Sequence, residues 1–169
     1  RTRHITILAV LLGCQGIDEF RAMLPAALRM GVSATEAKEI VYQATAYLGI
    51  GRVFPFLKAV NEVFEKEGIA LPLESRATTD AEASDDGKNP KNRRVAGTAA
   101  QVAIFGDGMK DFYKSGAEDS RHINYWLASN CFGDWYTRGG LTLSERELIT
   151  FCFLYAQGGC EAQLTGHTQ

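Results

Sequence analysis

The sequence predicts an all-α protein, and three observations support that fold class. Apolar residues recur every three to four positions over most of the chain, a spacing that places them on one face of a helix. Alternation of apolar and polar residues at period two, which is typical of strands, never lasts beyond a few positions. The segments near the two ends also resemble each other, since each combines an apolar helix, a glycine break and a second helix.

The likeness between the two ends is a residue-by-residue correspondence. A constant shift places Arg3 on Arg146, Leu11 on Leu154, Gly16 on Gly159 and Asp18 on Glu161. The copies differ in polar content, since the later one has Glu147, Cys160 and His167 where the earlier one has His4, Ile17 and Leu24. The pattern indicates a tandem duplication in which the first copy is scaffold and the second carries chemistry.

Four helices are predicted in the first repeat, residues 1–73. The first two span about 2–13 and 17–30. A third follows the capping box Ser33–Glu36 and ends at Gly49, and a fourth has Pro55 in its first turn, where a missing N–H costs nothing.

A polar connection over residues 74–97 separates this repeat from the second one, residues 98–169. Residues 81–94 have no aliphatic side chain larger than alanine, so we expect an exposed, mobile segment. Further helices are predicted at about 98–113 and 119–130, followed by an aromatic, glycine-rich stretch and by a capping box, Ser144–Glu147, that opens the repeated helix. We expect the second repeat to continue beyond Gln169, because the chain ends within a predicted helix.

Composition excludes several classes of partner. A net charge of −2 gives no electrostatic footprint for nucleic acid or an anionic membrane, and no apolar run reaches the roughly 18 residues of a membrane span. The four cysteines lack metal-ligand spacing, so we expect free thiols of a reducing cytoplasm, with no metal and no cofactor. Of these, Cys14 and Cys152 are predicted to be buried core residues.

The last helical segment carries the candidate nucleophile and base. Cys160 follows two glycines and begins a predicted helix, whose dipole favours a thiolate; a small residue chosen for close packing is the alternative. His167 lies two turns further on the same face, about 10 Å along the axis, with Gln163 between them. The sulfur and the imidazole are therefore too far apart to bond directly, but a bound substrate or water would bridge them.

The remaining candidates precede this segment. Glu147 is either an acid–base group or simply the closing residue of the capping box at Ser144. Arg138 and Arg146 are candidate anchors for a substrate carboxylate, because a guanidinium matches a carboxylate bidentately; surface ion pairs are the alternative. Trp135, in the aromatic stretch beside Arg138, is a further candidate for substrate contact.

In these residues and their order the chain resembles the carboxymuconolactone decarboxylase family, which includes the alkyl hydroperoxidase D-like proteins. The resemblance is carried by residues 28–49 in the first half and, in the second, by residues 132–138 followed by 146–167. It covers nearly the whole chain apart from the connection. It implies a helical bundle with a tandem repeat, a small-molecule substrate, and assembly into a trimer or hexamer.

The resemblance also assigns site residues. The hydroperoxidase branch uses a glutamate, a pair of cysteines and a histidine on successive helices, which correspond here to Glu147, Cys160 and His167. Gln163 stands in the place of the second cysteine. The missing thiol is the one nearest the histidine, where the attacking sulfur is expected.

Three functions remain open on these grounds. The first is an acid–base lyase or isomerase acting on a small cyclic carboxylate or lactone, with His167 moving the proton and Glu147 orienting it. The second is a thiol peroxidase of antioxidant, peroxiredoxin-like activity, in which Cys160 attacks a peroxide. The third is a helical oligomer without enzymatic activity.

Overall fold

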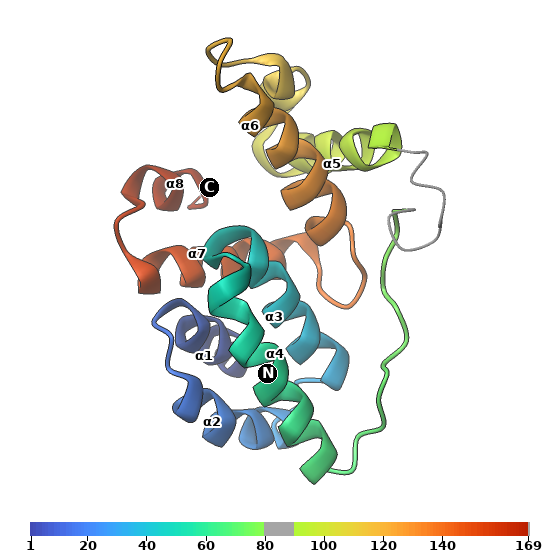
Figure 1. Ribbon diagram of the computed structural model, residues 1–169, viewed down its shortest axis with the longest axis vertical. Coiled ribbons are helices and arrows are strands. Elements are labelled where there is room, and N and C mark those ends of the chain that lie inside the picture. Colours follow the sequence, from blue (N-terminus) through green and yellow to red (C-terminus); the bar gives the residue numbers. More distant parts are fainter. Residues whose placement is uncertain (80–89, 169) are drawn as a thin grey trace. The chain divides into compact units, whose positions relative to one another are not determined.

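The computed structural model describes residues 1–79 and 90–168 (Figure 1). Every regular element in those ranges is helical, which confirms the all-α fold class. The chain divides into two compact units, the first made of Arg1–Glu74 with Gly140–Gln169 and the second of Ser75–Gly139. Residues 80–89, most of the predicted mobile stretch, lie outside the described residues.

The first unit contains six helices in the described ranges. They are α1 (Thr2–Gly13), α2 (Ile17–Arg29), α3 (Ala34–Leu48), α4 (Ile50–Lys66), α7 (Leu143–Gln157) and α8 (Glu161–Gly166). The predicted ends of the first three hold to within a residue. The prediction for the fourth is wrong, because α4 begins at Ile50 and Pro55 lies inside it. Residue Gly51, whose carbonyl loses its partner there, is exposed to water, so the missing N–H costs little.

Helices α1, α3 and α7 run parallel and form the centre of this unit. Arg1 contacts Glu145 at the starts of α1 and α7, and a Cβ built on Gly13 would lie 2.7 Å from Ala156 Cβ at their ends. Fully buried side chains fill the space between the three helices, among them Ile5, Leu8, Leu12, Ile40, Ile149 and Phe153. Helices α2 and α4 pack on each other through Phe20 and Phe56, whose rings meet edge to face at 5.2 Å.

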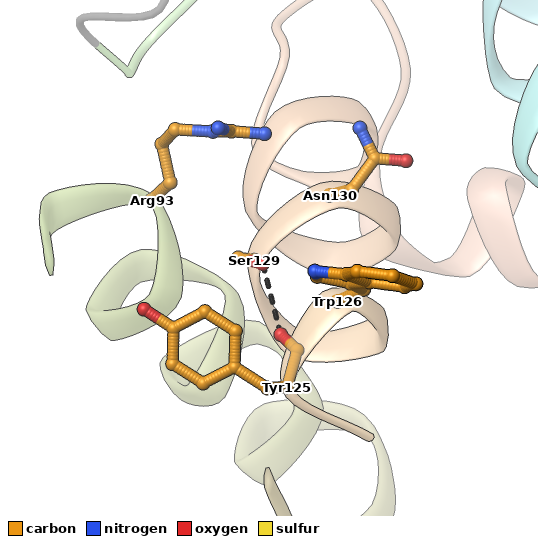
Figure 2. A pocket seen from close by; sticks show the side chains of 5 residues that line it. All are labelled: Arg93, Tyr125, Trp126, Ser129 and Asn130. Carbon is orange, nitrogen blue, oxygen red and sulfur yellow. Dashed lines mark hydrogen bonds between the residues drawn. The ribbon is translucent and has the colours of Figure 1, made fainter. Parts of the chain in front are cut away.

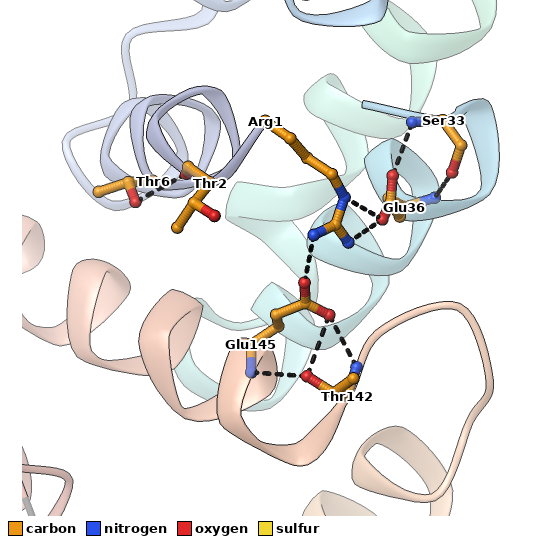
Figure 3. Close-up of polar contacts among 7 residues, drawn as sticks. All are labelled: Arg1, Thr2, Thr6, Ser33, Glu36, Thr142 and Glu145. Atoms are coloured by element: carbon orange, nitrogen blue, oxygen red, sulfur yellow. Dashed lines mark hydrogen bonds and ion pairs between the residues drawn. The ribbon is translucent and has the colours of Figure 1, made fainter. Parts of the chain in front are cut away.

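Two capping boxes meet at Arg1, as Figure 3 shows. At the start of α3, Ser33 and Glu36 exchange side-chain and backbone hydrogen bonds, as predicted. At the start of α7 the box is Thr142–Glu145, so the predicted box Ser144–Glu147 is wrong. The Arg1 guanidinium donates from Nε to Glu36 at 2.8 Å and from Nη1 to Glu145 at 2.5 Å. One cation therefore holds both boxes together.

The second unit has less regular helices than the sequence predicts, and their ends lie at other residues. Its elements are α5 (Pro90–Phe105), the 3₁₀ turns η1 (Asp107–Met109) and η2 (Phe112–Lys114), α6 (Arg121–Trp126) and the π-helix η3 (Leu127–Tyr136). Residues 90–97 are thus helical rather than part of a connection, and the helix predicted at 98–113 ends at residue 105. The one predicted at 119–130 starts at residue 121 and continues as η3 to residue 136.

A close crossing of α5 and η3 accounts for the early start of α5 and the late end of η3. A side chain on Gly97 would strike the Ala128 carbonyl, and one on Gly133 would strike the Arg93 carbonyl, so both glycines allow the two backbones to touch. Arg93 spans the crossing with a bidentate ion pair to Asp134, whose Oδ1 accepts from Nε at 2.6 Å. Arg93, a polar residue of the predicted connection, thus serves a helix contact.

The compact units do not follow the predicted repeat boundaries, because residues 140–169 pack with the first 74 residues. The tandem repeat stays a prediction about the sequence. Among the helices of the described ranges, none combines the length and the apolar character that crossing a membrane requires.

Candidate active site

The structure brings His167 and Glu147 together in the first unit. Helix α8 ends at Gly166, and the His167 backbone N–H closes its last turn on Gln163 and Leu164. This turn directs the imidazole at α7, where Nδ1 lies 2.6 Å from Glu147 Oε2. The two side chains are 12% and 17% exposed, so the pair is largely shielded from water but still reachable.

An aromatic wall fixes the imidazole from a second side. The Tyr47 ring, from the last turn of α3, meets the His167 ring edge to face at 5.9 Å. Tyr47 in turn contacts Phe153 of α7 at 6.3 Å. The imidazole is therefore held between a carboxylate and a ring, and both come from helices of the central core.

The contact with an ionised carboxylate determines which imidazole nitrogen carries the proton and which carries the lone pair. An ionised carboxylate only accepts hydrogen bonds, so Nδ1 of His167 carries the proton when the imidazole is neutral. That tautomer leaves the Nε2 lone pair as the base. The other Glu147 oxygen, Oε1, is buried and has no hydrogen-bond partner within the described ranges, so it can accept a hydrogen bond from a bound substrate or water.

Glu147 is available for this contact because it does not cap its helix. Thr142 and Glu145 satisfy the start of α7, which removes the structural alternative that the sequence left open for Glu147. Its partner His167 was found from the sequence, but the direct contact between the two was not part of that prediction.

The Cys160 sulfur is engaged in two hydrogen bonds within its own turn. Its Sγ donates to the Leu154 carbonyl at 3.4 Å and accepts from Gln157 Nε2 at 3.5 Å. Helix α8, which it precedes, has six residues, so the dipole on which the predicted thiolate depends is small. A sulfur that uses its proton in a hydrogen bond is less ready to attack a peroxide.

None of the four cysteines forms a disulfide in the described part of the chain. Cys152 is buried as predicted, and burial raises the pKa of its thiol. The prediction for Cys14 is wrong: α1 ends at Gly13, so Cys14 falls in the turn and is exposed.

Arg146 serves the scaffold and not a ligand. Its side chain is fully buried, with Nη2 3.1 Å from Glu39 Oε2 and Nη1 donating to Gln43 Oε1 at 2.8 Å. Gln43 returns a hydrogen bond from Nε2 to the Arg146 carbonyl at 2.9 Å. This clamp joins α3 to α7 one residue before Glu147, and so positions the catalytic candidate.

Sequence reasoning missed Glu39 and Gln43, although a signal was present. The two lie four residues apart on α3, among apolar side chains that face the core. A glutamate and a glutamine on that face require buried hydrogen-bond partners. Their partner, Arg146, lies more than a hundred positions later in the sequence, so no local pattern points to it.

The other predicted contact residues are placed as follows. Trp135 and Arg138 belong to the second unit, where Arg138 is 9% exposed and the Trp135 indole N–H is buried without a partner among the described residues. The Gln163 side chain is exposed. Their roles toward a substrate stay predictions. No group of three potential metal ligands occurs among the described residues.

Comparison with known proteins gives no further assignment. The chain matches no protein-family model, and searches of curated proteins and of solved structures find no significant match.

Proposed function

We propose that the protein is an acid–base enzyme of the carboxymuconolactone decarboxylase type, a lyase or isomerase acting on a small cyclic carboxylate or lactone. The observation that carries the proposal is the 2.6 Å contact between His167 Nδ1 and Glu147 Oε2. In many enzymes the general base is a histidine of which one ring nitrogen is hydrogen-bonded to a carboxylate while the other takes up the proton.

In this proposal each group of the pair has one task. His167 Nε2 removes a proton from the substrate and returns it to the carbon or oxygen that needs it. Glu147 keeps the imidazole in the productive tautomer and stabilises the imidazolium formed during transfer. Since Arg146 is committed to Glu39 and Gln43, its part in this proposal is to hold α7, and with it Glu147, against α3.

We also propose that the chain arose by tandem duplication. The parallel packing of α1 on α7 supports this, because Gly13 and Ala156, which meet there, are corresponding positions of the two copies. The earlier copy has His4 where the later one has Glu147, which is why only one catalytic pair is proposed.

The test is turnover of a carboxylated lactone by single-site variants. We expect His167→Asn and Glu147→Gln each to lower kcat/KM by about 10²- to 10⁴-fold, because the first removes the base and the second removes the carboxylate that orients it. Carbon dioxide release and lactone absorbance report the reaction. His4→Gln, at the corresponding position of the earlier copy, is the matched control and should keep full activity.

The same assay separates the alternatives. Cys160→Ser should retain lactone turnover if the proposal is correct. Peroxide reduction that depends on Cys160, with no lactone turnover, would instead establish a thiol peroxidase. Absence of both activities in the unsubstituted protein would leave a helical oligomer without catalysis.

A further inference from the structure

The second unit has two neighbouring cavities on its helical surface, and neither belongs to the site described above. One, of about 510 Å³, is lined by Tyr113, Lys114, Arg121, His122 and Tyr125. The other, of about 430 Å³, is lined by Arg93, Tyr125, Trp126, Ser129 and Asn130, as Figure 2 shows. Tyr125 lines both. The larger cavity has the size of a small-molecule site.

Aromatic rings form the walls of the larger cavity. Tyr113 and Tyr125 face each other edge to face with ring centroids 6.3 Å apart. His122 is held by Trp126, whose ring lies 4.7 Å away. Such rings offer both faces and edges to a flat ligand, and they are already fixed by one another, so little freedom is lost on binding.

The cations around these rings are only partly neutralised. Lys114 pairs with Asp111 at 2.6 Å. The Arg121 guanidinium, by contrast, has no ion pair or hydrogen bond among the described residues, and Arg94 lies 4.3 Å over the Tyr113 ring without a carboxylate partner there. Arg121 is therefore a cation of the cavity lining that no carboxylate of the described residues contacts.

A flat ring and an anion together satisfy these walls. A guanidinium binds carboxylate and phosphate through paired N–H donors, and tyrosine rings take up aromatic surface. We infer that the cavity bounded by Tyr113, Arg121 and Tyr125 binds an aromatic anion, a planar ring bearing a carboxylate or phosphate. The ring packs on the two tyrosines and the anion pairs with Arg121. This site is independent of the proposed lyase activity.

Calorimetric titration of the full chain tests the site with benzoate and phenyl phosphate as probes. Benzyl alcohol and inorganic phosphate represent the ring and the anion alone, and both should bind at least about tenfold more weakly than phenyl phosphate, a difference of roughly 1.4 kcal/mol. A preference for benzoate or for phenyl phosphate identifies the anion, and either preference supports the inference.

Variants locate the site. Arg121→Gln should weaken both anionic probes about tenfold, and Tyr125→Leu should weaken every probe that contains a ring. Lys110→Gln is the matched control, because Lys110 is an exposed cation of the same unit that pairs with Asp107 and does not line the cavity. Its affinities should stay within twofold of the unsubstituted protein.

Amide chemical shifts of the unsubstituted protein give a readout that does not depend on how the variants fold. Titration with phenyl phosphate should shift residues 113–114 and 121–125. The inference is overturned if neither ring-bearing anion binds at millimolar concentration, if inorganic phosphate binds as tightly as phenyl phosphate, or if Arg121→Gln binds normally.

Discussion

Glu147 shows how a shift of two residues changes the role of a side chain. The sequence contains two overlapping capping patterns, Thr142–Glu145 and Ser144–Glu147, and both have the required spacing. Spacing alone cannot choose between them. The choice depends on Arg1, which pairs with Glu145 from the far end of the chain. The contacts of Arg146 with Glu39 and Gln43 were not predicted for the same reason, since more than a hundred residues separate the partners in the sequence. Cys160, Gln163 and His167 were recognised because they lie within eight residues of one another.

The paired carboxylates at Arg1 make stability depend on acid. Burial opposes ionisation of Glu36, but hydrogen bonds from Arg1 and Ser33 outweigh it and hold the pKa of Glu36 below its usual value. Arg1 likewise lowers the pKa of Glu145. A carboxyl whose pKa is lower in the folded state adds stability above its ordinary pKa of 4.5, and this stability is lost as the pH falls through the folded-state pKa.

We therefore expect Arg1→Gln to lower the free energy of unfolding by about 1 kcal/mol at pH 7, a modest value because the guanidinium is partly exposed. The loss should shrink as the pH falls below 4.5 and through the lowered folded-state pKa values, because the carboxylates then become protonated in both proteins. Urea unfolding at several pH values measures this. Arg29→Gln, whose ion pair to Glu67 is exposed, should show no such pH dependence.

Lys38 makes stability rise with pH as well, but in the alkaline range and because burial disfavours its charged form. It is 8% exposed, donates to Asn61 and lies near the rings of Tyr42 and Phe64, and burial lowers its pKa below 10.5. The unfolded chain then binds more protons than the folded one between the two pKa values, so the free energy of unfolding should rise as the pH approaches 10.5.

Replacing Lys38 with Met should abolish that rise, because no amine remains to titrate. Denaturant unfolding between pH 7 and pH 10 is the measurement. Lys58→Met, which removes an exposed amine of α4, is the control and should leave the slope unchanged. An unchanged slope in Lys38→Met would contradict the assignment.

At the scale of elements, helix ends were predictable where the signal is local. The ends of α1, α2 and α3 follow from glycine breaks and one capping box, all within a few residues of the boundary. The ends of α5 and η3 were not, because contacts across the Gly97–Gly133 crossing extend both helices beyond their apolar pattern. Tertiary packing there overrides local preference.

In the first unit, Gly13 allows close contact between two helices, α1 and α7, as Gly97 and Gly133 do in the second unit. A Cβ at this position would lie 2.7 Å from Ala156 Cβ and 2.9 Å from the Phe153 carbonyl oxygen. Since that oxygen belongs to a helix backbone, it cannot move aside, and we expect Gly13→Ala to destabilise the protein by about 1–3 kcal/mol. Thermal unfolding followed by circular dichroism measures the loss.

Gly51→Ala provides the matched control. Its Cβ would meet open space within α4, so the substitution should be neutral or stabilise by up to about 1 kcal/mol. Equal effects of the two substitutions would show that α1 and α7 are not in close contact at Gly13.

At the scale of the whole molecule, the sequence predicted two consecutive repeats, whereas the compact units interleave along the chain. Fold class and helix content follow from periodicity. Which helices share a core depends on contacts between residues more than a hundred positions apart, and no local pattern encodes those.

The family resemblance predicts a homo-oligomer, a trimer or hexamer. The first unit has large apolar side chains in contact with solvent: Tyr155 is 69% exposed, Phe54 62% and Ile50 60%. We expect these to lie in subunit contacts, so that Phe54→Lys and Tyr155→Lys lower the mass measured by light scattering. Ile123→Lys, an equally exposed site of the second unit, is the control. A monomeric unsubstituted protein would contradict the prediction.

The shared core of α1 and α7, which lie more than a hundred residues apart in the sequence, has a consequence for synthesis. The second unit is a continuous stretch of residues and can acquire its contacts while the chain is still being made. Helix α1 must wait for α7, because its buried face has no other complete partner. Helix α1 therefore leaves the ribosome well before its partner is made, and although it is synthesised before the second unit it reaches its final surroundings after it.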